Sequence, residues 1–279
     1  MPHLAASCFP TLFVTLILLL CACGDDPAAT EPTGPPAAAA DSLATNVQPA
    51  PELAPGTVLT AWVDGLFLRA QPATGGTIVA QVPGGAELTY TGRQSDTTST
   101  IVLRGIAFRQ PWLEVRTVDN REGWVFGGAT TAPGEQKDDG YRSNLEFTFP
   151  QFGSFDLTDW ERQAPYEARA GKSVSEILIY QKDDRRLAVK TTEVPADKNY
   201  SRLYTLTTMG GKLLKTRAFR YEAKPGGSEL TETVTDYTVN PQRTYTRRQR
   251  LSQPVGELNA RPELAAGEWT TTEGAGSPR

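Results

Sequence analysis

The chain has 279 residues, of which 39% are hydrophobic and 22% are charged, and its formal net charge is −4. Its three cysteines and its single histidine all lie within the first 23 residues. Histidine is the commonest general base and a frequent metal ligand, and a catalytic cysteine usually pairs with it. Beyond residue 23 the composition therefore excludes Cys-His pairs, Ser-His-Asp triads and zinc sites built from histidine. We expect a protein that is not an enzyme and that holds no cofactor and no metal.

The first element is an apolar run over residues 9–20, followed by Cys21-Ala22-Cys23-Gly24. The run is too short to span a bilayer, which needs about 20 residues, and the small Ala22 before Cys23 suits a cleavage site. This segment resembles a bacterial lipoprotein signal with its lipobox. The resemblance implies a signal peptide over residues 1–22, lipid attachment at Cys23 and a place in the bacterial cell envelope. It leaves open whether the protein faces the periplasm or the cell surface at the outer membrane.

Residues 23–55 are rich in Pro, Ala, Asp and Thr and contain almost no large apolar side chain. Such a segment cannot bury enough surface to offset its ordering entropy, so it is expected to be a disordered tether. The first 55 residues hold five acidic residues and no Lys or Arg, whereas residues 182–250 hold 15 basic and 8 acidic residues. The basic surplus is therefore confined to one block of the chain.

Residues 56–130 form short runs rich in Val, Ile, Leu, Thr and aromatic residues, separated by Gly-Gly and Pro-Gly, which indicates a small β-domain. The runs over residues 66–72, 78–88, 112–115 and 123–126 resemble, in order and spacing, the pattern of bacterial SH3 (SH3b) domains. The resemblance implies an SH3-like barrel that recognises peptidoglycan or an envelope peptide without cleaving it. In this pattern the tryptophans at positions 112 and 124 usually belong at least partly to the core, so a structural role stays open for both. The candidate ligand-binding residues are Arg69, Tyr90, Phe108, Trp112 and Trp124.

The barrel pattern is interrupted by an insertion that reads as an extra hairpin. Two apolar runs, at residues 101–103 and 106–108, flank Arg104-Gly105. An insertion on a rigid barrel is a common place for recognition, so a ligand is expected to meet the protein here.

Residues 131–140 are a polar hinge, and residues 141–270 are expected to form a second β-domain of no recognised family. Four phenylalanines and Trp160 crowd residues 147–160, and a core plug beneath the following sheet is favoured over a ligand cage. From residue 174 to 251 strand-like runs alternate with turns at 183–184, 210–211, 224–227 and 240–241, which predicts a β-meander of about six strands. The fold class is therefore all-β: a small SH3-like barrel followed by an antiparallel β-meander domain, either a curved sheet or a half-barrel. Residues 271–279 are expected to be a disordered tail.

Basic side chains recur on neighbouring strands of the meander and suggest a basic face for an anionic envelope partner, although they also suit an ordinary soluble sheet surface. Nucleic acid is a poor partner for an exported protein. Acidic pairs and triplets at residues 138–139, 156–161 and 183–184 supply carboxylates, but a glycosidase needs two of them across a cleft, and nothing in the pattern indicates one. The candidate basic face comprises Arg217, Arg220, Arg243, Arg247 and Arg248.

The sequence therefore favours a lipid-anchored, non-catalytic binding protein whose partner is the cell-wall polymer or an envelope protein, and which meets the membrane only through its lipid. One alternative is a scaffold that docks on another envelope protein and accepts a partner strand on its C-terminal sheet. Another is a carrier that holds an apolar ligand inside the meander.

Overall fold

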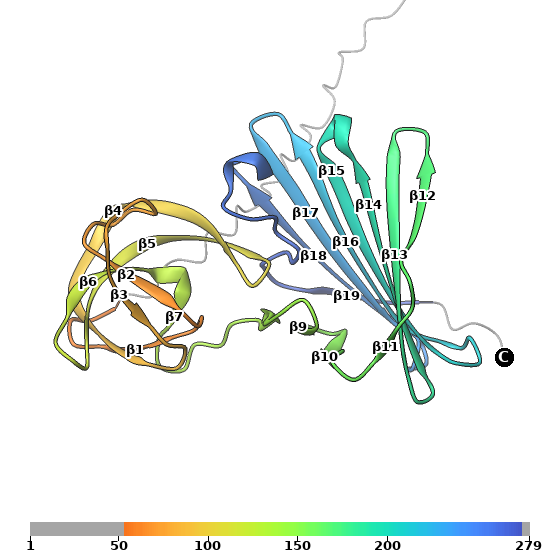
Figure 1. The fold of residues 1–279 in the computed structure, drawn as a ribbon, viewed down its shortest axis with the longest axis horizontal. Helices are drawn as coiled ribbons and strands as arrows, with labels where there is room; N and C mark the ends of the chain where they lie inside the picture. Colours follow the sequence, from red (N-terminus) through yellow and green to blue (C-terminus); the bar gives the residue numbers. More distant parts are fainter. Residues whose placement is uncertain (1–52, 275–279) are drawn as a thin grey trace, which may run out of the picture. The chain divides into compact units, whose positions relative to one another are not determined.

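The computed structural model describes residues 53–274, all of which lie in one compact unit of the chain (Figure 1). The predicted signal peptide, Cys23 and most of the predicted tether lie outside the described residues. The described part contains β-strands and three short 3-10 turns but no α-helix. The predicted all-β fold class is confirmed.

The N-terminal half is a small barrel whose seven strands follow the order β3-β2-β6-β5-β4-β1-β7. Its interior is filled by side chains that alternate inward along short strands, among them Leu68, Leu88, Val115 and Val125, none of which is exposed. The strands are β1 (Val58–Ala61), β2 (Leu66–Arg69), β3 (Ile78–Val82), β4 (Glu87–Leu103), β5 (Ile106–Thr117), β6 (Glu122–Phe126) and β7 (Thr130–Thr131).

The predicted extra hairpin is present, because β4 and β5 continue past the barrel as a long two-stranded ribbon (Figure 1). Its two-residue turn is Arg104-Gly105, and both residues have positive φ, at 51° and 83°. A tight turn of this hand matches the twist of the flanking strands and favours glycine at the second position.

The C-terminal half is one antiparallel sheet that curls into a half-barrel, with β13 to β18 lying side by side in sequence order (Figure 1). The predicted meander is confirmed, including its turns. The sheet ends at β19 on one side. On the other side, the short strands β11 and β12 each pair with β13. The strands are β11 (Glu161–Arg162), β12 (Tyr166–Ala170), β13 (Ser173–Lys182), β14 (Arg185–Val194), β15 (Asn199–Thr208), β16 (Leu213–Lys224), β17 (Gly227–Asp236), β18 (Arg243–Leu251) and β19 (Thr270–Glu273).

The inner face of the half-barrel is filled by the aromatic segment that precedes it. A small sheet of β8 (Gly140–Tyr141), β9 (Glu146–Phe149) and β10 (Gly153–Asp156) carries buried phenylalanines into one cluster with Tyr204 and Leu187. The rings of Phe147 and Phe149 stack with centroids 4.7 Å apart. The predicted core plug is confirmed, and the interior is packed with the chain's own side chains.

The tip of the long hairpin is buried against the C-terminal half. Asn259 accepts a hydrogen bond from the backbone N–H of Val102 at 2.8 Å and donates one to its carbonyl at 3.2 Å. The carbonyl of Gly105 accepts bonds from the N–H groups of Glu263 and Leu264. Val102 also shares a buried cluster with Tyr200, Phe219, Tyr221 and Leu230 of the half-barrel. The hairpin tip, expected to be a free recognition element, is instead the joint between the two halves.

The last strand differs from the sequence-based expectation. Residues 271–279 are predicted to be a disordered tail, whereas Thr270–Glu273 pairs antiparallel with β18, from Thr246 to Arg243. Three consecutive threonines suit an exposed edge strand, and their small number made the signal weak.

Candidate functional site

Two members of the predicted basic face lie inside the half-barrel. Arg217 is completely buried and Arg247 is 3% exposed. Both donate to the buried carboxylate of Glu232, with Nε–Oε distances of 2.6 Å and 2.9 Å. The guanidinium of Arg217 also lies 3.8 Å from the ring centroid of Phe149, while Arg247 reaches Asp138 at 2.6 Å. These two arginines therefore join the sheet to the aromatic plug and to the linker, and they do not belong to an exposed surface.

The remaining basic candidates are exposed but do not form a dense patch. Arg220 and Arg248 flank Thr231 on the outer face, in register across β16, β17 and β18. Arg243 lies near the edge and pairs with Glu273 at 3.4 Å. Alternation along the strands places Arg220 and Arg248 on the opposite side of the sheet from Arg217 and Arg247. Arg243 shares the parity of Arg247, and it is exposed at the start of β18.

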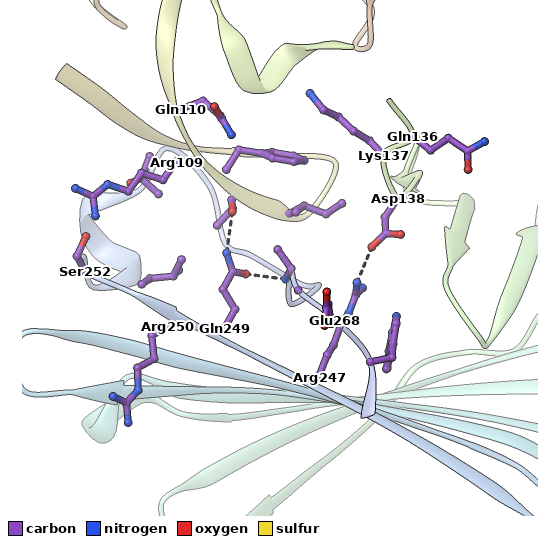
Figure 2. A pocket seen from close by; sticks show the side chains of 18 of the residues that line it. Arg109, Gln110, Gln136, Lys137, Asp138, Arg247, Gln249, Arg250, Ser252 and Glu268 are labelled. Carbon is purple, nitrogen blue, oxygen red and sulfur yellow. Dashed lines mark hydrogen bonds and ion pairs between the residues drawn. The ribbon is translucent and has the colours of Figure 1, made fainter. Parts of the chain in front are cut away.

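A groove of about 580 Å³ lies between the long hairpin, the linker and the C-terminal sheet, and we call it the hairpin groove (Figure 2). The strand β5 forms one side, the linker residues 135–138 form the second, and residues 266–269 form the third. Its floor is apolar, whereas its rim is charged. The residues that line it include Ala107, Phe108, Arg109, Gln110, Gln136, Lys137, Asp138, Arg247, Gln249, Arg250, Glu268 and Trp269.

The floor of the hairpin groove is ordered by Gln249, which is 8% exposed. Its Nε2 donates to the carbonyl of Ala107 at 2.9 Å, and its Oε1 accepts from the N–H of Ala266 at 2.8 Å (Figure 2). Arg247 completes this end of the groove by facing Asp138 and lying 4.4 Å from the ring centroid of Trp269. Because both ends of its side-chain amide are bonded, Gln249 fixes β18 relative to β5 and to residue 266 beneath the groove.

The ammonium group of Lys137 is bonded within the protein and is not a free cation. Its ammonium donates to the carbonyls of Gly128 and Thr130 and lies 3.5 Å from Glu135. Desolvation by burial lowers the pKa of Lys137, partly offset by the nearby Glu135 carboxylate. The ammonium also lies 5.4 Å from the ring centroid of Phe108. The predicted ligand-binding Phe108 is thereby half-buried under Lys137 and reaches only the wall of the groove.

A second cavity, of about 620 Å³, lies where turns and the aromatic plug meet at one end of the half-barrel. It brings together Asp156, Asp183 and Asp184 from two of the acidic groups noted in the sequence. A hydrogen bond from Thr158 lowers the pKa of Asp156, which keeps this carboxylate ionised. A glycosidase acid needs the opposite shift.

A partly buried acidic group lies beside this cavity. Burial by itself raises the pKa of Asp236, but hydrogen bonds from Thr238 and the ion pair with Lys215, at 3.0 Å, outweigh it and hold the pKa below its ordinary value of 3.8. The pair ties β16 to β17 at this end of the sheet.

Two predicted ligand-binding residues of the barrel belong to its core. Tyr90 is 4% exposed and Trp112 is 3% exposed. The indole N–H of Trp112 donates to the hydroxyl of Ser99 at 2.9 Å, and its ring meets Phe126 edge to face. These two side chains are therefore structural, which is the reading the sequence had left open for Trp112.

The other tryptophan of the pattern reaches the surface. Trp124 is half-buried on β6, in register with Arg69 of β2 and Glu114 of β5. A Cβ on Gly123 would approach the carbonyl oxygen of Arg69 to 2.7 Å, so glycine is what lets β6 enter beside β2 and place the indole there.

Charged and aromatic neighbours extend this surface on both sides of Trp124. Arg93 lies 5.5 Å from the indole centroid and pairs with Glu114 at 2.7 Å, while Arg69 lies 5.3 Å from the ring centroid of Phe67. Phe67 is 41% exposed. We call Phe67, Arg69, Arg93, Glu114 and Trp124 the tryptophan stripe. Phe67 is not among the ligand-binding residues predicted from the sequence, although its place between two inward-facing leucines indicates an outward side chain.

Residues 64–131, which form most of the barrel, match the family model of the bacterial SH3 domain. The resemblance inferred for the barrel is thereby confirmed, and the SH3 domain includes Arg69, Trp124 and the long hairpin. No curated protein and no solved structure matches the chain.

Two further features of residues 53–274 bear on function. No helix in this part of the chain has the length and apolar character required to cross a membrane. Nor do three or more His, Cys, Asp or Glu side chains gather there in a geometry that would hold a metal ion. A bacterial SH3 domain is consistent in general terms with binding to cell-wall or envelope components outside the cytoplasm.

Proposed function

We propose that the protein is a non-catalytic binding protein of the bacterial cell envelope, anchored through a lipid on Cys23, and that its SH3 domain binds the peptide part of the cell wall through the tryptophan stripe. The C-terminal half-barrel acts as a rigid base for the SH3 domain. Its interior is filled by aromatic side chains, which favours a supporting role over that of a carrier.

The observation that carries this proposal is the exposure of Trp124 between charged groups. The other large rings of the SH3 pattern, Tyr90 and Trp112, are buried in the core. The indole of Trp124 presents an apolar face, and a ligand carboxylate can pair with Arg69 or compete with Glu114 for the exposed Arg93. Stem peptides of the cell wall offer carboxylates and amines on short side chains, so their chemistry complements the stripe.

The test is co-sedimentation of residues 53–279 with purified insoluble peptidoglycan. We expect the wild-type protein to pellet, and Trp124→Ala to bind about tenfold more weakly or worse, as is usual when a central tryptophan is removed from an interface. Val118→Ala is the matched control, because Val118 is 85% exposed on the same domain but lies outside the stripe.

Thermal unfolding of both variants verifies that the barrel is intact. Equal binding by Trp124→Ala and the wild type would exclude the stripe. If the wild type itself stays in solution, the cell-wall ligand is excluded and an envelope protein becomes the partner to seek.

A further inference from the structure

The strand β12 forms a free edge of the C-terminal sheet. We propose that two copies of the protein pair there, β12 against β12, in antiparallel register about a two-fold axis at Ala168. The product is a homodimer in which the two sheets become continuous. Such an interface is isologous, because each copy contributes the same strand. It is separate from the tryptophan stripe and does not depend on what the SH3 domain binds.

The edge of β12 is open and carries few of the usual protections. Among the described residues, only β13 pairs with β12, which Figure 1 shows as the outermost strand of the sheet. Four of its five residues are exposed. Free edges are usually blocked by lysine, proline or a bulge. Within its five residues β12 has no lysine, no proline and no shift of register, and its two charges have opposite signs.

The register of β13 shows which backbone groups of β12 face the free side. The N–H of Gln163 donates to the carbonyl of Ile179 at 2.9 Å, so Ile179 directs its backbone groups towards this edge of β13. Residues two apart in a strand direct these groups to the same side. The odd-numbered residues of β13 therefore bond to their partners in β12, which are the even-numbered ones. Glu167 and Arg169 lie between these partners, and they direct their N–H and C=O groups outward.

A second β12 strand satisfies these outward groups. With the two-fold axis at Ala168, Glu167 of each copy lies opposite Arg169 of the other. Both residues direct their N–H and C=O groups outward, so each of the two pairs exchanges two main-chain hydrogen bonds. The two Ala168 residues form the pair between them, which is of the non-bonded kind with closely spaced side chains. Alanine is small enough to fit there.

The charges of β12 complement themselves in this register. Each Glu167 meets an Arg169, whereas an axis moved by one residue would set two glutamates or two arginines opposite each other. Within one copy Glu167 lies opposite Glu176, and none of these three charged residues forms an ion pair with a described residue. Like charges directly opposite each other destabilise a sheet. An arginine arriving on the free side of Glu167 therefore relieves a repulsion that the single copy retains.

The size of the contact predicts a weak dimer. The register also covers Tyr166, which is 63% exposed, by setting it opposite Ala170 of the second copy. Pro165 precedes the strand and cannot donate a main-chain bond, so the pairing ends there. A contact of five residues a side is at the small end of specific interfaces, and we expect the dimer to dissociate on dilution.

The first experiment is disulfide trapping in residues 24–279, which contain no cysteine. In Ala168→Cys the two thiols lie on the axis, where Cα atoms about 4.5 Å apart suit a disulfide. Ala170→Cys is the matched control, because four residues separate its two copies along the paired strands, about 14 Å, which is too far to bridge. Under mild oxidation we expect Ala168→Cys to form covalent dimer at least about tenfold faster than Ala170→Cys.

The second experiment tests the charges by sedimentation equilibrium. Arg169→Glu and Glu167→Arg should each weaken the dimer about tenfold or more, because each sets like charges opposite each other twice. The double variant Glu167→Arg/Arg169→Glu should restore the wild-type affinity to within about twofold, since it rebuilds both pairs in reverse. Lys190→Glu is the control, because Lys190 is an exposed cation on β14, away from the edge, and its reversal should change nothing.

Hydrogen exchange of the wild-type protein supplies a readout that needs no variant. The amides of Glu167 and Arg169 should become protected as the protein concentration rises. The proposal is overturned if the wild type stays monomeric at millimolar concentration, if both cysteine variants cross-link equally, or if the double variant fails to restore the dimer. Particles larger than a dimer would also overturn it, since they indicate head-to-tail pairing of unlike edges. Protection of both amides at every concentration would overturn it as well, because the chain's own N-terminal segment would then occupy the edge.

Discussion

Removing the carboxylate of Glu232 should cost more than any other single charge deletion in the half-barrel. Glu232 is fully buried and serves two arginines at once, with Nε–Oε distances of 2.6 Å to Arg217 and 2.9 Å to Arg247. It also accepts from the backbone N–H of Ala265 at 3.2 Å. In Glu232→Ala, Arg217 keeps its bond to a backbone carbonyl but loses its carboxylate, and Arg247 keeps only Asp138.

The expected magnitude follows from this burial. Breaking a buried ion pair by removing one partner costs about 3–5 kcal/mol, because an uncompensated charge stays out of water. A domain of this size is stable by about 5–15 kcal/mol, so the variant should lose about a fifth or more of that margin. At roughly 2–4 °C per kcal/mol, the midpoint of thermal unfolding should fall by about 10 °C.

The assay is urea unfolding of residues 53–279, followed by tryptophan fluorescence and by circular dichroism. Glu229→Ala is the matched control, since Glu229 lies on the same strand but faces outward, and its loss should change stability by less than about 0.5 kcal/mol. Replacing Arg217, Glu232 and Arg247 together by Met, Leu and Leu should restore wild-type stability or exceed it. A Glu232→Ala variant as stable as Glu229→Ala would refute the reasoning.

Three other predictions follow from the structure. Asp236→Asn should destabilise the protein at neutral pH, and the difference should fade as the pH falls below 3.8 through the lowered pKa of Asp236, which unfolding at several pH values measures. Gly227→Ala would place a Cβ against the carbonyl oxygen of Leu251 and should lower the unfolding midpoint sharply, whereas Gly256→Ala, with open space around it, should not; equal midpoints would contradict this. A fragment ending at Thr130 should be oligomeric or bind a hydrophobic dye, because the hairpin tip loses its cover, and a monomeric, dye-free fragment by light scattering would show that the tip needs none.

Much of the strand pattern could be predicted because it depends on local chemistry. The Arg104-Gly105 turn needs two positive φ angles, and the apolar runs on either side alternate as strands do. The aromatic plug could also be predicted, since four phenylalanines in a short span are usually buried in a core. The role of the hairpin could not be predicted, because the sequence around Val102 fits a free hairpin as well as one buried against a second sheet.

The candidate site was predicted less well, for a related reason. Trp112 and Trp124 are both tryptophans on neighbouring strands, but one faces the core and the other the surface. Arg217 and Arg247 look like surface residues by composition. A signal was present, since Arg217 shares the parity of the buried Phe219, and Glu232 shares that of Leu230. Parity within a strand shows which residues share a face, but not that a charged residue on the inner face has found its counter-charge.

The sequence by itself determined the strands, their turns and the absence of histidine and cysteine chemistry beyond residue 23, because these depend on composition and on neighbours along the chain. The tertiary structure decided which groups meet. Only the folded sheet sets Glu232 between two arginines, and only the docked hairpin creates the hairpin groove. These contacts join residues on different strands, 15 positions apart for Glu232 and each arginine and 109 for Arg247 and Asp138, and no local pattern encodes them.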